Sequence, residues 1–160
     1  MKLKTLSCVI GVALSLAAGA ALAQEKRTVL TLETAKKIAA ACEQKAKAEG
    51  WKMNIAIMDD GGNLKYFLRQ DGAFRGSIQV AQLKANTSSM FPFSTKQIGE
   101  ITKNIPGIAF VPGLVTFEGG LPIVTGSGEP IGSVGVSGGT AEQDGICAQA
   151  GLDAAKDSLK

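Results

Sequence analysis

The feature that most constrains this fold is a glycine-rich stretch at residues 119–139, which contains two runs typical of β-strands. The runs at 121–125 and 131–136 are separated by five residues that include two glycines and a proline. This pattern predicts an antiparallel hairpin, because such a turn needs positive φ angles that glycine adopts readily. We expect the hairpin to form the centre of the sheet. Gly132 and Gly135 lie inside its second strand, where an interior glycine indicates close approach either of a ligand or of a packed helix.

The N-terminal residues 1–23 have the pattern of a secretory signal peptide. Lys2 and Lys4 precede an apolar run at 6–22, which ends in an Ala-x-Ala cleavage motif at 21–23. A retained membrane anchor is the alternative, but the run is shorter than the roughly 20 residues of a spanning helix and lacks a basic flank. We therefore expect an exported protein, periplasmic or secreted, whose mature chain begins at Gln24 and forms one domain over residues 24–160.

Composition excludes several classes of function. Without Lys2 and Lys4, 15 of the 17 basic residues remain against 14 acidic ones, so the mature chain is nearly neutral and has no basic stripe for nucleic acid. The chain contains no histidine, which excludes serine–histidine–aspartate catalysis, histidine-ligated zinc and imidazole ligation of haem. The carboxylates also lack the spacing of a calcium loop, so we expect no metal site.

The remaining pattern predicts an α+β domain. Residues 31–50 carry a narrow stripe of small apolar residues at helical spacing and end at a glycine. Two strands are predicted at 51–58 and 63–69, joined by an Asp-Asp-Gly-Gly turn. Further helices are predicted at 77–90, 95–103 and 140–159, the last two with capping boxes. Residues 104–118 form a predicted loop with at most one short strand at 114–117, and a loop this long commonly covers a pocket or a subunit contact.

The two cysteines of the mature chain, Cys42 and Cys147, both lie in the middle of predicted helices on faces of small residues. In an exported domain such a pair favours a disulfide between the two helices. The alternative is two buried free thiols that act as small hydrophobic side chains. A catalytic role is disfavoured, because neither thiol has a histidine to activate it and an apolar setting raises a thiol pKa.

Several motifs, distributed in order over nearly the whole mature chain, support a family assignment. The motifs are Asp60-Gly61-Gly62, Arg69 with residues 71–73, residues 84–88 with Phe91 and Thr95, residues 119–122, residues 131–138, and Asp144 with residues 147–151. Together they resemble the GlcG/HbpS-like proteins, a family that includes the C-terminal domain of PduO, haem-binding secreted proteins and sensory adaptors. The resemblance implies a single domain with an antiparallel sheet of about five strands. It also implies that the first and last helices lie side by side, in a profilin-like arrangement.

The same resemblance implies a homo-oligomer, a tetramer or octamer, that binds haem or a related tetrapyrrole and partners a membrane sensor. Histidine often ligates the iron where haem binding has been assigned in the family, and this chain has none. Ligation then falls to another side chain, or haem is held without a protein ligand or is not bound at all. The candidate ligands are Tyr66, Met53, Met58, Met90 and Thr95.

The leading hypothesis is an exported, non-enzymatic protein that binds a small anionic ligand such as haem. A tetrapyrrole needs an apolar slot and cations for its propionates. The slot is expected from Phe74, Phe91, Phe93, Phe110 and Phe117, and the cations from Arg69 and Lys84. The expected ligand-binding residues are Arg69, Lys84, Ser88, Thr95, Phe117, Gly119 and Gly120. Each phenylalanine has the alternative of core or subunit interface, and each cation that of a solvated surface charge.

Two other hypotheses remain open. In the first, the protein is an enzyme that acts on a small carboxylate, with Lys84 or Asp60 as base and Arg69 as anion clamp. Either base would need burial to bring its pKa toward neutrality. In the second, the glycine-rich loops only build the interface of a structural oligomer.

Overall fold

The computed structural model describes residues 27–160, so the predicted signal peptide and its cleavage site lie outside the described residues. The elements, in chain order, are α1 (Leu32–Ala48), β1 (Asn54–Asp59), β2 (Leu64–Arg69), α2 (Ser77–Met90), α3 (Thr95–Asn104), the 3₁₀ helix η1 (Pro106–Phe110), β3 (Gly120–Val124), β4 (Pro130–Ser137), α4 (Ala141–Ala155) and the 3₁₀ helix η2 (Lys156–Leu159). Between residues 27 and 160, no helix combines the length and apolarity that crossing a bilayer requires.

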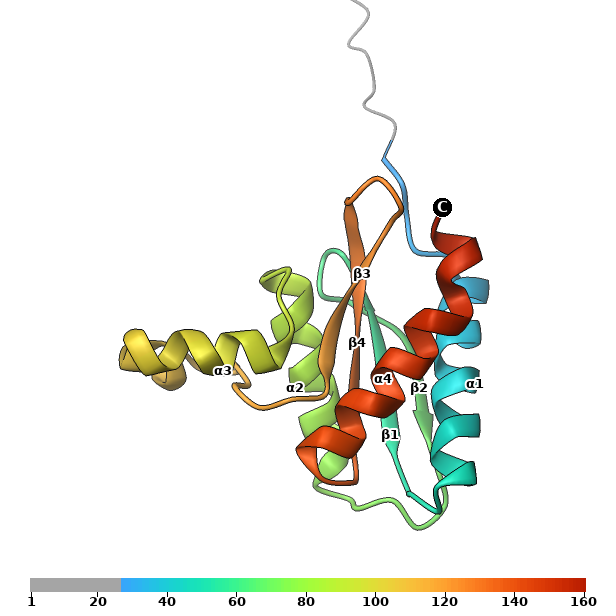
Figure 1. Cartoon of the computed structure of the whole chain (residues 1–160), viewed down its shortest axis with the longest axis horizontal. Helices are drawn as coiled ribbons and strands as arrows, with labels where there is room; N and C mark the ends of the chain where they lie inside the picture. The colour runs from blue at the N-terminus through green and yellow to red at the C-terminus, as the bar shows by residue number, and fades with distance from the viewer. Residues whose placement is uncertain (1–26) are drawn as a thin grey trace, which may run out of the picture.

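A four-stranded antiparallel sheet with the order β2-β1-β4-β3 forms the middle layer of the domain (Figure 1). The α+β class is confirmed, although the sheet has four strands and not about five. The predicted hairpin is β3–β4, but only β4 is central, and β3 is an edge strand in which Pro122 is tolerated. Residues 114–117 form no strand, since the N–H of Val115 donates to the hydroxyl of Thr87 in α2 at 3.0 Å.

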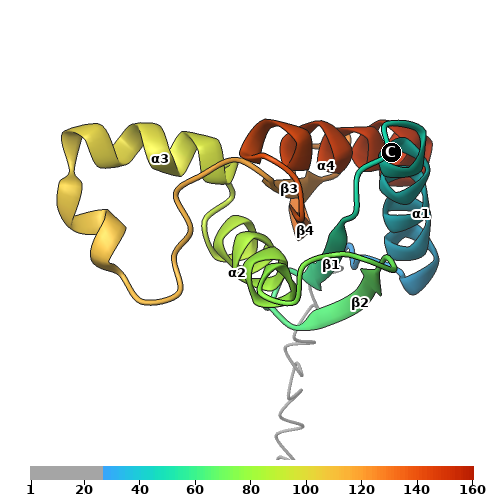
Figure 2. The same ribbon diagram turned by 90° about the horizontal axis from the view of Figure 1, so that it is seen from below.

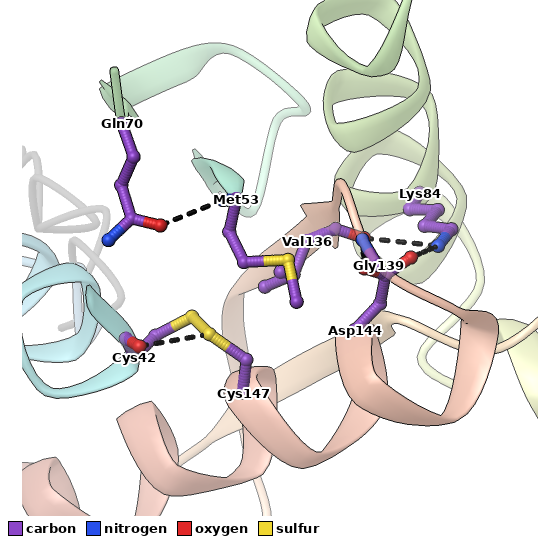
Figure 3. Close-up of a disulfide and its surroundings, with 8 residues drawn as sticks. All are labelled: Cys42, Met53, Gln70, Lys84, Val136, Gly139, Asp144 and Cys147. Atoms are coloured by element: carbon purple, nitrogen blue, oxygen red, sulfur yellow. Dashed lines mark hydrogen bonds and ion pairs between the residues drawn. A yellow bond between two sulfur atoms is a disulfide. The ribbon is translucent and has the colours of Figure 1, made fainter. Parts of the chain in front are cut away.

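The helices α1 and α4 pack side by side on one face of the sheet, as expected (Figure 1). Ile55 and Ile57 of β1, together with Val134 and Val136 of β4, point into this layer and form the main core with both helices. Small residues bring the helices close together: a Cβ added at Gly151 would lie 2.7 Å from the carbonyl oxygen of Ile38. The predicted disulfide between Cys42 and Cys147 crosses this contact and is fully buried (Figure 3).

The helix α2 covers the opposite face of the sheet (Figure 2). Gly135 in β4 makes this packing possible, because a Cβ at this position would lie 2.1 Å from the carbonyl oxygen of Ala81 and 2.3 Å from the backbone nitrogen of Ala85. At Gly132, a Cβ would lie 2.3 Å from the carbonyl oxygen of Met58. Gly135 thus allows the close approach of a helix and Gly132 that of the neighbouring strand, and neither position leaves room for a ligand.

The segment from α3 to residue 116 projects from the sheet as an arm (Figures 1 and 2). Ser94 caps α3 with a complete capping box, and the returning chain packs against the helix at Gly99, where an added Cβ would lie 2.2 Å from the carbonyl oxygen of Thr116. Ile105, Phe110 and Val111 are exposed on this arm. The arm therefore offers apolar side chains to solvent instead of contributing them to the core.

Candidate functional site

A buried ion pair lies at the centre of the predicted site. The ammonium group of Lys84, which is 0% exposed, donates to Asp144 Oδ2 at 2.7 Å and to the carbonyl oxygen of Val136 at 3.0 Å (Figure 3). Its nitrogen also lies 4.7 Å from the centre of the Phe117 ring, within cation–π distance. Phe117 itself is about half exposed, so this contact joins the buried ammonium group to a residue at the surface.

Three elements from different parts of the chain hold this pair. Lys84 belongs to α2, on one face of the sheet, whereas Asp144 lies in the first turn of α4, on the other. The capping box at Thr140 starts α4, and Asp144 Oδ1 accepts a hydrogen bond from the N–H of Gly139 at 3.0 Å. The pair therefore connects helices on opposite faces at the end of β4.

Burial dominates the electrostatics of the pair. Removal from water lowers the pKa of Lys84, and the hydrogen bond and charge of Asp144 offset part of this effect. Burial likewise raises the pKa of Asp144, against the opposing effects of Lys84 and the N–H of Gly139. Each charge is thus stabilised mainly by the other, and removing one would leave its partner uncompensated.

The glycines that precede β3 pack against this pair. A Cβ added at Gly119 would lie 2.6 Å from the Lys84 nitrogen, and one at Gly120 would lie 2.5 Å from Thr95 Cγ2 and 2.9 Å from Ser88 Oγ. The N–H of Gly120 donates to the Thr95 hydroxyl at 2.9 Å. These glycines therefore do not form the open anion cradle that the sequence suggested, because the Lys84 and Thr95 side chains fill the space beside them.

The structure brings together six of the seven predicted site residues. The six are Lys84, Ser88, Thr95, Phe117, Gly119 and Gly120. Arg69 is the exception, since it lies on β2, two strands away from β4, and lines a separate hollow beside α1. The expectation that Arg69 and Lys84 meet the same ligand is corrected accordingly. The sequence did not predict Asp144 as the partner of Lys84, although both residues are among the family motifs, which was the usable signal.

The residues of the enzymatic alternative do not converge either. Asp60 lies in the β1–β2 turn, where it forms an ion pair with Arg27, whereas Arg69 ends β2. The strand from Leu64 to Arg69 has six residues, so about 17 Å of extended chain separates its ends. Lys84 has no open side from which to abstract a proton from a ligand. Among the described residues, neither Lys84 nor Asp60 therefore forms one site with Arg69.

A groove lined largely by apolar residues lies between the C-terminal end of α2 and the returning part of the arm. Its volume is about 230 Å³. The lining residues are Asn86, Thr87, Met90, Phe91, Val111, Pro112, Gly113 and Leu114. Of the five phenylalanines expected in an apolar slot, only Phe91 is among them. Phe74, Phe93, Phe110 and Phe117 are also exposed, but they do not line this groove.

The structure separates the candidate haem ligands by exposure. Met53 and Met58 are buried in the core, and the Tyr66 ring packs against it. Thr95 is buried and its hydroxyl already accepts from Gly120. Met90 is 58% exposed and lines the apolar groove. Among these candidates Met90 is therefore the most exposed, whereas Tyr66 is only partly exposed, and a thioether is an established type of haem ligand. Residues 27–160 contain no cluster of three or more cysteine, aspartate or glutamate side chains that could hold a metal ion.

Comparison with known proteins assigns the chain to a family. Residues 30–153 match the family described as haem degrading protein HbpS-like. GlcG of Escherichia coli strain K12 is 37% identical over 113 residues, which cover 69% of this chain and 83% of GlcG. A double mutant of HbpS from Streptomyces reticuli has a similar crystal structure, with a TM-score of 0.76 and 30% identity over 94% of this chain and 97% of that one. The crystal structure of a PduOC:heme complex gives a TM-score of 0.72 and 26% identity over 79% of this chain and 95% of that one. The chain therefore belongs to the HbpS-like family, as its motifs indicate.

Proposed function

We propose that this protein binds haem or a related tetrapyrrole in the groove between α2 and the arm, with Met90 as a ligand to the iron. The family description and the haem complex of its relative PduOC support a haem-related ligand. The single observation that carries the proposal is the position of Met90, an exposed thioether in the lining of an apolar groove.

The groove suits one edge of a flat apolar ring. Its volume of about 230 Å³ is below the roughly 300–1,000 Å³ of pockets that enclose small ligands. A tetrapyrrole in this groove therefore projects beyond it toward solvent. The groove lining contains no lysine or arginine, so the propionates of a bound haem stay in water and form no ion pair there. We consequently expect haem affinity to depend only weakly on ionic strength.

The surroundings of Met90 are compatible with this role. Its sulfur lies near Gly62 in the β1–β2 turn, where an added Cβ would be 3.5 Å from the sulfur and 3.1 Å from Asn86 Oδ1. The absence of a side chain at Gly62 therefore leaves space beside the thioether. A bound haem would supply a redox-active iron, and the protein would supply the thioether ligand and the apolar contact of Phe91.

The test is titration of the purified protein with haemin, followed by visible absorbance in the oxidised and reduced states. We expect saturable binding with the spectral signature of iron–thioether ligation, loss of that signature in Met90→Ala, and a shift to an imidazole-type spectrum in Met90→His. Phe74→Ala is the matched control, since Phe74 is exposed but lies outside the groove. Identical spectra for the wild type and Met90→Ala would remove Met90 from the site, and the absence of saturation would remove haem as the ligand.

We further propose that the protein is exported, forms a tetramer or octamer, and serves as a sensory adaptor for a membrane sensor. The exposed apolar side chains of the arm support assembly, because exposed apolar patches commonly mark protein interfaces. Phe110, at 84% exposure, is the most exposed large hydrophobic residue described. Light scattering should therefore show that Phe110→Ser lowers the oligomer mass; an unchanged mass would place the interface elsewhere.

A further inference from the structure

A second hollow, of about 280 Å³, lies on the opposite edge of the sheet from β3, between α1 and the end of β2. It is lined by Glu43, Lys47, Lys52, Arg69, Gln70 and Asp71. None of these residues lines the Met90 groove, so the two features are independent. Its lining is polar and charged, unlike that of the groove.

The charges in this hollow are only partly compensated. Glu43 and Lys47 form an ion pair one helical turn apart, at 2.8 Å. Among residues 27–160, no carboxylate lies within ion-pair distance of Lys52 or Arg69. Lys52 and Arg69 thus line the hollow without a carboxylate partner, and an anion there would gain interactions that the protein itself does not supply.

Gln70 adds a positioned donor to this charge. Its side chain is 6% exposed, and its Oε1 accepts from the N–H of Met53 at 2.8 Å (Figure 3). The backbone N–H of Gln70 also donates to the carbonyl oxygen of Met53 at 3.0 Å, so both ends of the residue are fixed. This leaves the Nε2 group as the free end of a rigidly held amide in the wall of the hollow.

We propose that this hollow binds a small monocarboxylate that also carries a hydrogen-bond donor, such as a hydroxyl or an ammonium group. The planar guanidinium of Arg69 matches a carboxylate in two parallel hydrogen bonds, and Gln70 and Lys52 belong to the same lining. Asp71 and Glu43 disfavour a doubly charged anion such as sulfate by repulsion, but they accept from the ligand's own donor. The lining thus favours a ligand that combines one carboxylate with a hydrogen-bond donor.

The test follows backbone amide resonances of ¹⁵N-labelled protein during titration with lactate, alanine, acetate and sulfate. We expect saturable shifts at residues 43–47, 52 and 69–71 with lactate or alanine, and weaker binding of acetate and sulfate. Arg69→Gln should weaken the binding of lactate about tenfold or more, the scale of hydrogen bonds to a charged group. Arg69→Lys should retain only part of the wild-type affinity for lactate, because a lysine cannot form the two parallel hydrogen bonds. Arg75→Gln is the matched control, since Arg75 is an exposed arginine outside the hollow.

Several results would overturn the proposal. Equal lactate affinity in the wild type and Arg69→Gln, or shifts that do not saturate, would remove the site. Sulfate that binds as tightly as lactate would contradict the carboxylate assignment, and acetate that does so would contradict the role of the ligand's donor. The haemin titration has a different readout and uses different residues, so its outcome stands separately.

Discussion

Replacement of Lys84 by methionine should be strongly destabilising, because it removes one charge of a buried ion pair and leaves the other. Lys84 and Asp144 are 0% and 3% exposed, and their charged atoms are 2.7 Å apart. Breaking such a pair from one side typically costs about 3–5 kcal/mol, most of which is the burial of an uncompensated charge. We expect this cost for Lys84→Met, and a similar one for Asp144→Asn, in the free energy of unfolding. The same burial makes Lys84→Ala unsuitable for testing ligand contacts, since the variant would lose stability as well.

A double variant measures the interaction between the two charges apart from the interactions of each with the rest of the protein. In Lys84→Met with Asp144→Asn, no buried charge remains, so stability should return to within about 1–2 kcal/mol of the wild type. Urea unfolding of all four proteins under non-reducing conditions gives the coupling energy, which we expect to be at least about 3 kcal/mol. Lys103→Met is the control, because Lys103 pairs with Glu100 on the exposed surface. Loss of this exposed ion pair should hardly change the urea concentration at the midpoint of unfolding. Additive effects of the two single substitutions would refute the argument.

The cost of Lys84→Met should also shrink as the pH falls. Burial already raises the pKa of Asp144 in the wild type, and removal of the Lys84 charge raises it further. In this variant the folded state binds a proton more tightly than the unfolded state does, so stability rises as the pH falls through the folded pKa toward the ordinary value of 3.8. The stability difference between wild type and variant, measured over this range, should narrow; a constant difference would show that Asp144 stays charged.

Three further predictions concern the covalent structure and the packing. Free-thiol counting on the denatured, unreduced protein should find Cys42 and Cys147 bonded, and their reduction should cost about 4–5 kcal/mol, because the bond closes a span of 105 residues; two reactive thiols would exclude the bond. Gly135→Ala should lower the melting temperature sharply by forcing α2 away from β4, whereas Gly107→Ala, with no atom within 4 Å of the new Cβ, should change it little. Intact-mass analysis of the exported protein should show a chain beginning at Gln24, and a retained Met1 would contradict the predicted cleavage.

Local sequence patterns were sufficient to predict most of the elements. The capping boxes at Ser94 and Thr140 give the starts of α3 and α4, because a short polar side chain there satisfies backbone groups within three residues. The β1–β2 hairpin follows in the same way from its turn. For residues 114–117 the local pattern left a short strand open. They form no strand, because the backbone N–H of Val115 donates to the hydroxyl of Thr87, which lies 28 residues earlier in the chain.

The candidate site was only partly predictable. The family motifs identify Lys84, Thr95, Gly119 and Gly120, and the structure brings these residues together. The same motifs also include Arg69, which the structure places in a different hollow. A motif records which residues accompany a fold and does not specify which of them are neighbours in space.

The sequence by itself determined the helices α1 to α4, the two hairpins and the small-residue faces through which α1 and α4 meet, because each depends on interactions within a few residues or on a repeating pattern. Only the tertiary structure decided which charged groups pair and which candidate ligand residues are buried. Lys84 and Asp144 are 60 residues apart in the chain, and they neutralise each other because β4 brings α2 and the start of α4 to the same end of the sheet. The same packing buries Met53, Met58 and Thr95 and leaves Met90 exposed, since burial depends on which faces are covered by distant parts of the chain.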